Sequence, residues 1–372
     1  MRKLQRIPQW YFTGAITVVD QSHLPFYRTI ISVLKEFGKV PTEHIGYDYS
    51  AKWWDENRKD KNVYAEDFRG LDNSIALVAD ITLPTTGGGA EIDYKVRTGA
   101  PVLCVFEKGK EVSKYITHWS AGKTAKNLTV ESYENKEQLE NIVRTFASGV
   151  LNKHPPLAGA YIVLEGGEGS GKTTQRWQLV KHLREQGYDV EEAREPGGTK
   201  IAESIRKILQ DPELEKDDKI SPMTELFLFE AARSPLVTKK IIPALGRGAI
   251  FASDRCFWST IAYQGFGRDT NIPMIDILNN IAIAGIKPDL GIIIDVPPEV
   301  GLAKITKTEF GKADRFEQEK IDFHHRVLDG YRFVASREPN TVLLQYVDGI
   351  ENMQAIIREK VDVFLKENFK ET

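Results

Sequence analysis

Short extended segments alternate with segments of helical spacing in both halves of the chain. The segments that predict strands span residues 10–15, 40–45, 74–81, 102–106, 161–164, 249–253 and 290–295. The segments that predict helices span residues 22–37, 62–73, 90–98 and 175–186. Because such alternation is typical of parallel sheets with helices on both faces, the pattern predicts an α/β fold.

Candidate ligand-binding residues of the first half follow its predicted strands. Gly14 ends the first strand, and residues 84–89, which contain three consecutive glycines, follow the strand at 74–81. Glu91 comes two residues later. Ligands of parallel sheets bind at the carboxyl ends of the strands, so these residues predict a ligand site.

The segment at 151–158 predicts a boundary between two domains. At 372 residues the chain is longer than most single domains. Pro155 and Pro156 stiffen this segment and remove two backbone donors, so neither a helix nor a strand crosses it. We therefore predict a first domain at 1–152, a linker at 153–158 and a second domain at 159–372.

The composition excludes several classes of protein. The net charge is −3, so no excess of basic residues indicates a nucleic-acid partner. Cys104 and Cys256 lie far apart, which excludes a disulfide framework and fits a reducing cytosol. No apolar run approaches the length of a membrane span, and residues 9–12 are too short for a signal-peptide core. We expect a cytoplasmic protein without a membrane partner.

The most specific motif is a phosphate-binding loop (P-loop) between the strand at 161–164 and the helix at 175–186. It consists of Gly166, Gly167, Glu168, Gly169, Ser170, Gly171, Lys172, Thr173 and Thr174. Glycines let consecutive backbone N–H groups surround a phosphate, and the following helix adds the positive end of its dipole. Lys172 can reach the β- and γ-phosphates, and the Thr173 hydroxyl can ligate Mg²⁺. The motif predicts that the chain binds a nucleoside triphosphate.

Short motifs of the first half occur in a recognisable order. They are Tyr11-Phe12-x-Gly14, Thr42-Glu43-His44, Glu66-Asp67, Pro84-Thr85-x-Gly87-x-Gly89-x-Glu91 and Leu103-Cys104-x-Phe106. This series resembles the 2′-deoxynucleoside 5′-phosphate N-hydrolases and the related nucleoside 2-deoxyribosyltransferases, over about residues 8–148. The resemblance implies a Rossmann- or flavodoxin-like domain that cleaves the N-glycosidic bond of deoxynucleoside 5′-monophosphates.

The same resemblance implies roles for three residues of the first half. Glu91 matches the nucleophilic carboxylate of the family, Asp67 the acid that helps the base to leave, and Tyr11 the tyrosine that positions the nucleophile. A carboxylate that traps C1′ covalently is also the chemistry of retaining glycosidases.

The first half departs from this family at the segment that binds the 5′-phosphate. Family members commonly continue the first strand as Gly-Ser-Ile-Arg-Gly-Gly, whereas residues 14–19 of this chain are Gly-Ala-Ile-Thr-Val-Val. The phosphate would then rely on Thr85, Thr86, the loop amides and Ser113, which matches a serine supplied across a dimer. The residues of this half expected to bind substrate are Gly14, Thr85, Gly87, Gly89 and Ser113. A non-catalytic module that binds nucleotide or mediates dimerisation is the alternative for this half.

A second series of motifs accompanies the P-loop. It comprises Glu195-Pro196-Gly197-Gly198, Phe229-x-Ala231-Ala232-Arg233, Asp254-Arg255, Tyr263-Gln264-Gly265 and Asp314-Arg315-Phe316-Glu317. This series resembles thymidylate kinase from about residue 159 to residue 372. The resemblance implies the fold of a P-loop nucleoside monophosphate kinase and transfer of the ATP γ-phosphate to dTMP.

The resemblance also implies how the acceptor nucleotide is bound. Phe229 matches the ring that stacks on thymine, and Arg233 matches the guanidinium that hydrogen-bonds a thymine carbonyl. Arg206 and Arg255 match arginines on the acceptor phosphate, and Glu168 matches an acidic residue near the acceptor sugar. Arginine suits such planar, bidentate phosphate contacts.

The remaining expected site residues belong to the metal site, the lid and the substrate pocket. Asp254 ends a strand beside the P-loop and is suited to hold Mg²⁺ together with Thr173. The lid at 304–313 carries lysines where relatives with this P-loop usually carry catalytic arginines, so Lys307, Lys312 and Arg315 are expected to supply the charge. The other residues expected to bind substrate are Glu195, Pro196, Gly197, Ser259, Tyr263 and Gln264.

The sequence thus predicts a two-domain enzyme that phosphorylates dTMP with ATP and Mg²⁺ and also hydrolyses deoxynucleoside monophosphates. A kinase for another nucleoside monophosphate is the alternative for the second half. Both resembled families commonly form dimers, so we expect a homodimer.

Overall fold

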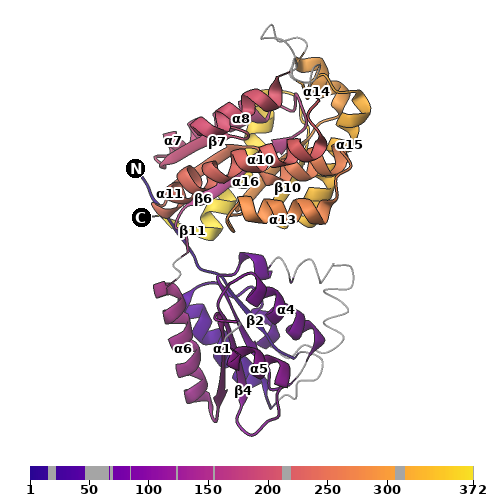
Figure 1. The fold of residues 1–372 in the computed structure, drawn as a ribbon. Coiled ribbons are helices and arrows are strands. Elements are labelled where there is room, and N and C mark those ends of the chain that lie inside the picture. The colour runs from indigo at the N-terminus through magenta and orange to yellow at the C-terminus, as the bar shows by residue number, and fades with distance from the viewer. Residues whose placement is uncertain are drawn as a thin grey trace. The chain divides into compact units, whose positions relative to one another are not determined.

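The chain folds into two compact units (Figure 1). The computed structural model describes residues 1–15, 22–46, 67, 70–83, 85–122, 125–153, 156–211, 219–305 and 315–371. We call Ile7–Pro156 the N-terminal unit, and Met1–Arg6 together with Leu157–Thr372 the P-loop unit. Among the described residues, no helix is both long enough and apolar enough to span a bilayer.

The described residues of the N-terminal unit form a parallel sheet of four strands in the order β2-β3-β4-β5. The strands are β2 (Trp10–Thr13), β3 (Ala76–Asp80), β4 (Val102–Glu107) and β5 (Leu128–Tyr133). The helices are α1 (Leu24–Phe37), the 3₁₀ helix η1 (Glu43–Gly46), α4 (Thr86–Arg97), α5 (Lys114–Ala121) and α6 (Lys136–Lys153).

Alternation along β2 decides which side chains of this sheet meet which helices. Trp10 and Phe12 are buried in the core that α1 and α6 cover. Tyr11 points to the opposite face and is buried with Ile92 of α4. The two cores confirm the predicted sheet with helices on both faces, and they place Tyr11 on the same side as α4.

In the P-loop unit, the part of the chain that the structure describes forms a parallel sheet of five strands in the order β10-β9-β6-β8-β7. These strands are β6 (Ala160–Gly166), β7 (Val190–Arg194), β8 (Ile250–Asp254), β9 (Leu290–Asp295) and β10 (Thr341–Gln345). The register pairs Leu164 of β6 with Asp254 of β8, so β8 ends beside the start of the P-loop.

Helices cover both faces of this sheet (Figure 1). Their bounds are α7 (Lys172–Glu185), α8 (Lys200–Gln210), α10 (Pro222–Leu236), the π-helix η2 (Val237–Ile241), α11 (Ile242–Gly246), α12 (Phe257–Thr260), the π-helix η3 (Ile261–Gly267), α13 (Ile272–Ala282), α14 (Pro298–Ile305), α15 (Ile321–Arg337) and α16 (Ile350–Asn368). Ile162 packs with α7 and α16, whereas Val163 packs in the core that contains α10, η3 and α15.

Residues 1–6 belong to the P-loop unit, although the sequence assigns them to the first domain. Strand β1 (Leu4–Arg6) pairs antiparallel with β11 (Phe369–Glu371), and Arg6 forms a bidentate ion pair with Asp289. The chain therefore leaves the P-loop unit after Arg6 and returns to it at Leu157. Three-residue strands carry too little pattern to reveal such pairing in the sequence.

Several strand predictions were wrong or incomplete. Within 40–45, Thr42 accepts a hydrogen bond from the Phe12 amide, and η1 begins at Glu43, so this segment is not a strand. Its neighbour Lys39 forms only an isolated bridge with Gln9. Strands β5, β7 and β10 were not predicted, and β10 rather than β9 is the outermost strand on its side of the sheet.

Candidate functional site

The P-loop connects β6 to α7 and bends where its glycines allow it. Gly166, Gly169 and Gly171 have φ of 147°, 68° and 86°, a region that residues with a Cβ rarely adopt. A Cβ on Gly169 would also lie 1.9 Å from the carbonyl oxygen of Gly301 in α14. The loop can therefore keep this shape only with glycine at these positions.

The side chains of the P-loop fit a site for phosphates and Mg²⁺. The Lys172 ammonium donates to the Gly167 carbonyl at 3.0 Å, and Thr173 donates its hydroxyl proton to Asp254. The hydroxyl of Ser170 is buried and has no partner among the described residues. Burial, followed by the nearby Arg255, lowers the pKa of Lys172. A hydroxyl and a carboxylate are hard oxygen ligands of the kind that Mg²⁺ prefers.

Arg255 follows β8 and contacts residues of the P-loop. Its guanidinium donates to the Glu168 carboxylate at 2.6 Å and to the Tyr263 hydroxyl at 2.9 Å. Burial opposes ionisation of Glu168, but Arg255 and Lys172 outweigh it and lower the pKa of Glu168 to about 2. Glu168, Arg255 and Tyr263 therefore form one hydrogen-bonded cluster.

Arg233 is enclosed by acceptors of the protein. Its guanidinium donates from Nε to Glu195 at 2.7 Å and from Nη1 to Glu230 at 2.6 Å. The other contacts are with Asn279 at 3.1 Å, Thr260 at 3.0 Å and the Cys256 carbonyl at 3.4 Å. All five donors of the guanidinium thus have a protein acceptor. A thymine carbonyl could bind Arg233 only by sharing one of these donors or displacing the distant Cys256 carbonyl.

Phe229 and Arg206 flank this region. The Phe229 ring packs against Phe316, with ring centroids 5.9 Å apart. Arg206 of α8 donates to the Pro196 carbonyl at 3.0 Å, next to Gly197, whose φ is 150°. The segment after β7 and two helices thus bring these expected substrate-binding residues together.

Two expected site residues instead converge on Glu225, a buried residue of α10. Gln264 donates to Glu225 at 2.7 Å, and the Arg315 guanidinium is bonded to the same carboxylate. Arg315 also donates to the Leu209 carbonyl at 3.0 Å. These contacts fix Arg315 and Gln264 within the protein. Lys307 and Lys312 lie outside the described residues.

The N-terminal unit gathers Tyr11, Glu91 and Asp67 into a second cluster. The Tyr11 hydroxyl donates to Glu91 at 2.8 Å, and the second oxygen of Glu91 is buried without a partner among the described residues. Burial raises the pKa of Glu91; hydrogen bonds from Thr13 and Tyr11 oppose the rise, and the charge of Asp67 adds to it. Glu66 lies outside the described residues.

The glycine-rich segment forms the first turn of α4. Thr85 caps this helix, because its hydroxyl accepts from the Gly88 amide at 3.0 Å. Among the described residues, no atom outside α4 lies within 4 Å of a Cβ built on Gly87 or Gly89. Elsewhere in the unit, Gly14 packs under the Tyr27 ring and Ser113 precedes α5. Pro84 and residues 16–21 lie outside the described residues.

Several polar residues that contact the expected site residues of the two units were not predicted from the sequence. In the P-loop unit these are Glu165, Glu225, Glu230, Thr260, Asn279 and Tyr331. In the N-terminal unit Thr13 is the missed residue. The available signal was a polar residue at the end of an apolar strand, which applies to Glu165 and Thr13.

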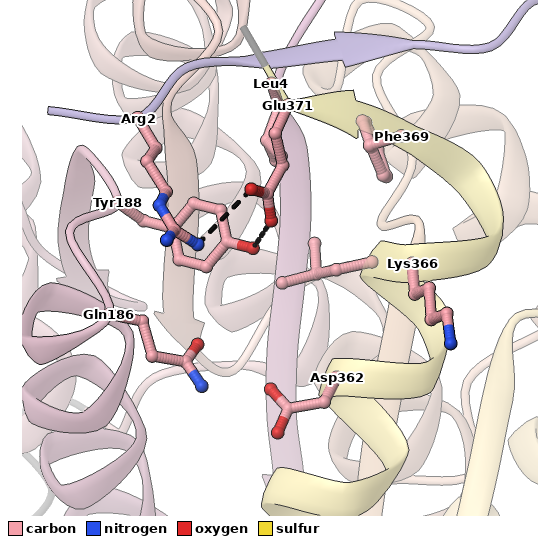
Figure 2. Close-up of a pocket in the computed structure, with 9 residues that line it drawn as sticks. Arg2, Leu4, Gln186, Tyr188, Asp362, Lys366, Phe369 and Glu371 are labelled. Atoms are coloured by element: carbon pink, nitrogen blue, oxygen red, sulfur yellow. Dashed lines mark hydrogen bonds and ion pairs between the residues drawn. The ribbon is translucent and has the colours of Figure 1, made fainter.

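A pocket of about 540 Å³ lies elsewhere in the P-loop unit, at the β1–β11 pair (Figure 2). Its lining includes Arg2, Tyr188, Asp362, Phe369 and Glu371. Figure 2 shows Arg2 and Tyr188 both directed at the Glu371 carboxylate, with hydrogen bonds of 3.2 and 2.6 Å. None of the site residues expected from the sequence lines this pocket.

Comparisons with known proteins identify the family of the P-loop unit. A family model described as thymidylate kinase matches residues 164–357. A thymidylate kinase of Synechococcus sp. (strain JA-2-3B'a(2-13)) is 43% identical over 49% of this chain and 84% of its own length. A thymidylate kinase of Thermoanaerobacter sp. (strain X514) is 39% identical over 56% of this chain and 99% of its own length. The chain in the crystal structure of thymidylate kinase from Ehrlichia chaffeensis is 31% identical in sequence. The match covers 55% of this chain and 98% of the Ehrlichia chain, with a TM-score of 0.44. The chain belongs to the thymidylate kinase family.

Proposed function

We propose that the P-loop unit transfers the γ-phosphoryl group of ATP to the 5′-phosphate of dTMP. The observation that carries this proposal is the cluster in which Arg255 and Lys172 both act on Glu168 within the P-loop. Phosphoryl transfer brings two polyanions into line, so cations and oriented N–H groups must offset their repulsion. Family membership supports the same reaction.

Each residue of the P-loop unit has a defined task in this proposal. Lys172 stabilises the charge on the phosphoryl group of the donor, and Arg255 binds the acceptor phosphate, exchanging its bond to Glu168 for a bond to phosphate. Thr173 and Asp254 would hold Mg²⁺, which neutralises phosphate charge when bound. Phe229 stacks on the base, and Arg233 fixes the pocket around it.

The test of the kinase proposal is ADP formation from ATP and dTMP by the whole protein. Lys172→Ala should lower kcat by at least a hundredfold, because this ammonium acts on charge that forms in the transition state. Lys181→Ala on the exposed face of the same helix is the matched control and should keep the wild-type rate. An unchanged rate for Lys172→Ala would refute the assigned site. The same assay with other nucleoside monophosphates tests the alternative of a different acceptor.

We further propose that the N-terminal unit hydrolyses the N-glycosidic bond of deoxynucleoside 5′-monophosphates. The Tyr11–Glu91 hydrogen bond of 2.8 Å, with Asp67 near enough to raise the pKa of Glu91, supports it. In the proposed reaction the Glu91 carboxylate attacks C1′ while the protonated form of Asp67 gives its proton to the departing base. Water then adds to C1′, which releases deoxyribose 5-phosphate, restores the Glu91 carboxylate and returns a proton to Asp67.

Chromatography of free base after incubation with several deoxynucleoside monophosphates tests this second activity. Glu91→Gln should abolish base release and keep dTMP phosphorylation, because Glu91 lies outside the P-loop unit. Asp93→Asn, two residues along the same helix, is the matched control. Release of no base from any deoxynucleotide would leave the alternative of a binding or dimerising module.

A further inference from the structure

Arg255 adopts a backbone conformation that is unfavourable for a residue with a side chain. Its φ is 74°, in the left-handed region. Such a conformation is strained and persists only where the surroundings enforce it. Because Arg255 is also the residue proposed to bind the acceptor phosphate, the contacts that enforce its conformation matter for the reaction.

Two adjacent residues of β6 hold the backbone around Arg255. The Arg255 amide donates to the Leu164 carbonyl at 3.0 Å, which continues the pairing of β6 with β8. The next amide, that of Cys256, donates instead to Oε1 of Glu165 at 2.8 Å. The Glu165 carboxylate thus takes the place of a backbone acceptor just where the chain turns out of the sheet.

The other oxygen of Glu165 acts on the Arg255 side chain through two hydroxyl groups. Oε2 accepts from Ser259 at 2.7 Å and from Tyr331 at 2.9 Å. These two hydroxyls in turn accept from Nη1 of Arg255, at 3.3 Å for Ser259 and 2.9 Å for Tyr331. Each hydroxyl donates to Glu165 and accepts from Arg255, so the directions of the bonds are mutually consistent.

Glu165 is fully buried, and it immediately precedes Gly166, the first residue of the P-loop. A buried carboxylate is costly, and its retention here is explained by the three donors that converge on it. The same side chain therefore links the strand that carries the P-loop to both the backbone and the guanidinium of Arg255.

We propose that Glu165 is a positioning residue that fixes Arg255 on the acceptor phosphate and thereby aligns acceptor and donor. This inference rests on the proposed kinase function and adds a residue to its site. A carboxylate is required because both oxygens act as acceptors. A glutamine has one acceptor oxygen, so its NH₂ group would face either the Cys256 amide or the hydroxyl pair.

Steady-state kinetics of Glu165→Gln with dTMP and ATP test the proposal. A shift of Arg255 by a fraction of an ångström to one ångström should lower kcat/KM for dTMP by about 10- to 100-fold. The KM for ATP should stay within about twofold, because the P-loop amides and Lys172 are unchanged. Tyr331→Phe, which removes only one hydroxyl, should show the same pattern with a smaller loss. Glu192→Gln on β7 is the matched control.

A double-mutant cycle separates this role from general damage. If Glu165 acts through the Tyr331 hydroxyl, the double variant should lose less activity than the product of the two single losses. Wild-type dTMP kinetics in both single variants would overturn the proposal. An equal rise in the KM for dTMP and the KM for ATP would overturn it as well. If Glu165→Gln does not fold, Tyr331→Phe alone decides between these outcomes. A wild-type protein that phosphorylates no nucleoside monophosphate would instead refute the kinase function itself.

Discussion

Two carboxylates compete for one guanidinium at Arg233. Glu195 and Glu230 both contact Arg233, and each leaves one buried oxygen without a partner among the described residues. The single positive charge cannot fully offset two negative charges in a buried site. Burial therefore raises the pKa of Glu195 to about 7: Arg233 opposes the rise, and Glu230 and Glu165 add to it. Glu195 therefore loses its proton less readily than a free glutamate. The pKa of Arg233 is also raised, so the guanidinium stays charged.

The raised pKa of Glu195 makes the stability of the P-loop unit depend on pH. An acid whose pKa is higher in the folded than in the unfolded state weakens folding as pH rises. The loss of folding stability begins near pH 4.5, where the unfolded chain starts to ionise, and is complete above about pH 7. The glutamine of Glu195→Gln cannot ionise. The free energy of unfolding of this variant, relative to that of the wild type, should therefore rise by on the order of 3 kcal/mol between pH 4.5 and 8.

Urea unfolding of both proteins at several pH values measures this difference. Glu191→Gln is the control for the loss of a carboxylate, because Glu191 lies in β7, the strand just before Glu195, and its side chain is partly exposed. A difference between Glu195→Gln and wild type that does not change with pH would contradict the raised pKa of Glu195.

At the scale of elements, the sequence predicts those that have a continuous apolar run or a specific motif. Strands β6, β8 and β9 are buried along their whole length, and each was predicted within one or two residues of its bounds. Strands β5, β7 and β10 lie at sheet edges and have mixed burial, so they lack that pattern. Strands β1 and β11 have three residues each and depend on their mutual pairing.

In the candidate sites, too, the residues that belong to a specific motif are the ones that the sequence predicts. The resemblance implies that Tyr11 positions Glu91, and the two residues are hydrogen-bonded in the structure. The contact of Glu168 with Arg255 was not predicted, although both residues were expected at the acceptor nucleotide. Glu165 was missed because its role depends on Tyr331, which is 166 residues away in the sequence. Likewise, no local pattern shows that protein acceptors already saturate Arg233. The sequence predicts which residues gather, and the hydrogen-bond partners of each come from the tertiary packing.

At the scale of the whole molecule, Arg6 ties together both ends of the segment that leaves the P-loop unit. Its guanidinium donates to the carbonyls of Leu157 at 2.9 Å and Gly159 at 2.8 Å, and it pairs with Asp289. Asp289 also accepts from the Tyr161 amide at 2.8 Å, at the start of β6. Residues 7–156 are thus an insertion whose entry and exit are held by one side chain.

Arg6→Ala should therefore destabilise the P-loop unit and spare the N-terminal unit. The side chains of Arg6 and Asp289 are 26% and 15% exposed, so we expect a loss of about 1–3 kcal/mol, less than for a fully buried pair. Hydrogen exchange measured by mass spectrometry reports on each unit separately, and β6 should exchange faster in the variant. Arg2→Ala is the matched control, because its ion pair with Glu371 is about half exposed and should contribute less than 1 kcal/mol. Equal effects of the two substitutions would show that Arg6 has no special role.

The pairing of β1 with β11 also sets the order of events during synthesis. Arg2 and Glu371, which contact each other at this pair, are 369 residues apart. At a translation rate of about 5–20 residues per second, the first strand waits roughly 20–70 seconds for its partner. Residues 7–156 emerge in the meantime with their own complete sheet. The nascent chain can therefore finish the inserted unit on the ribosome, while the surrounding unit closes only after residues 369–371 have left the exit tunnel.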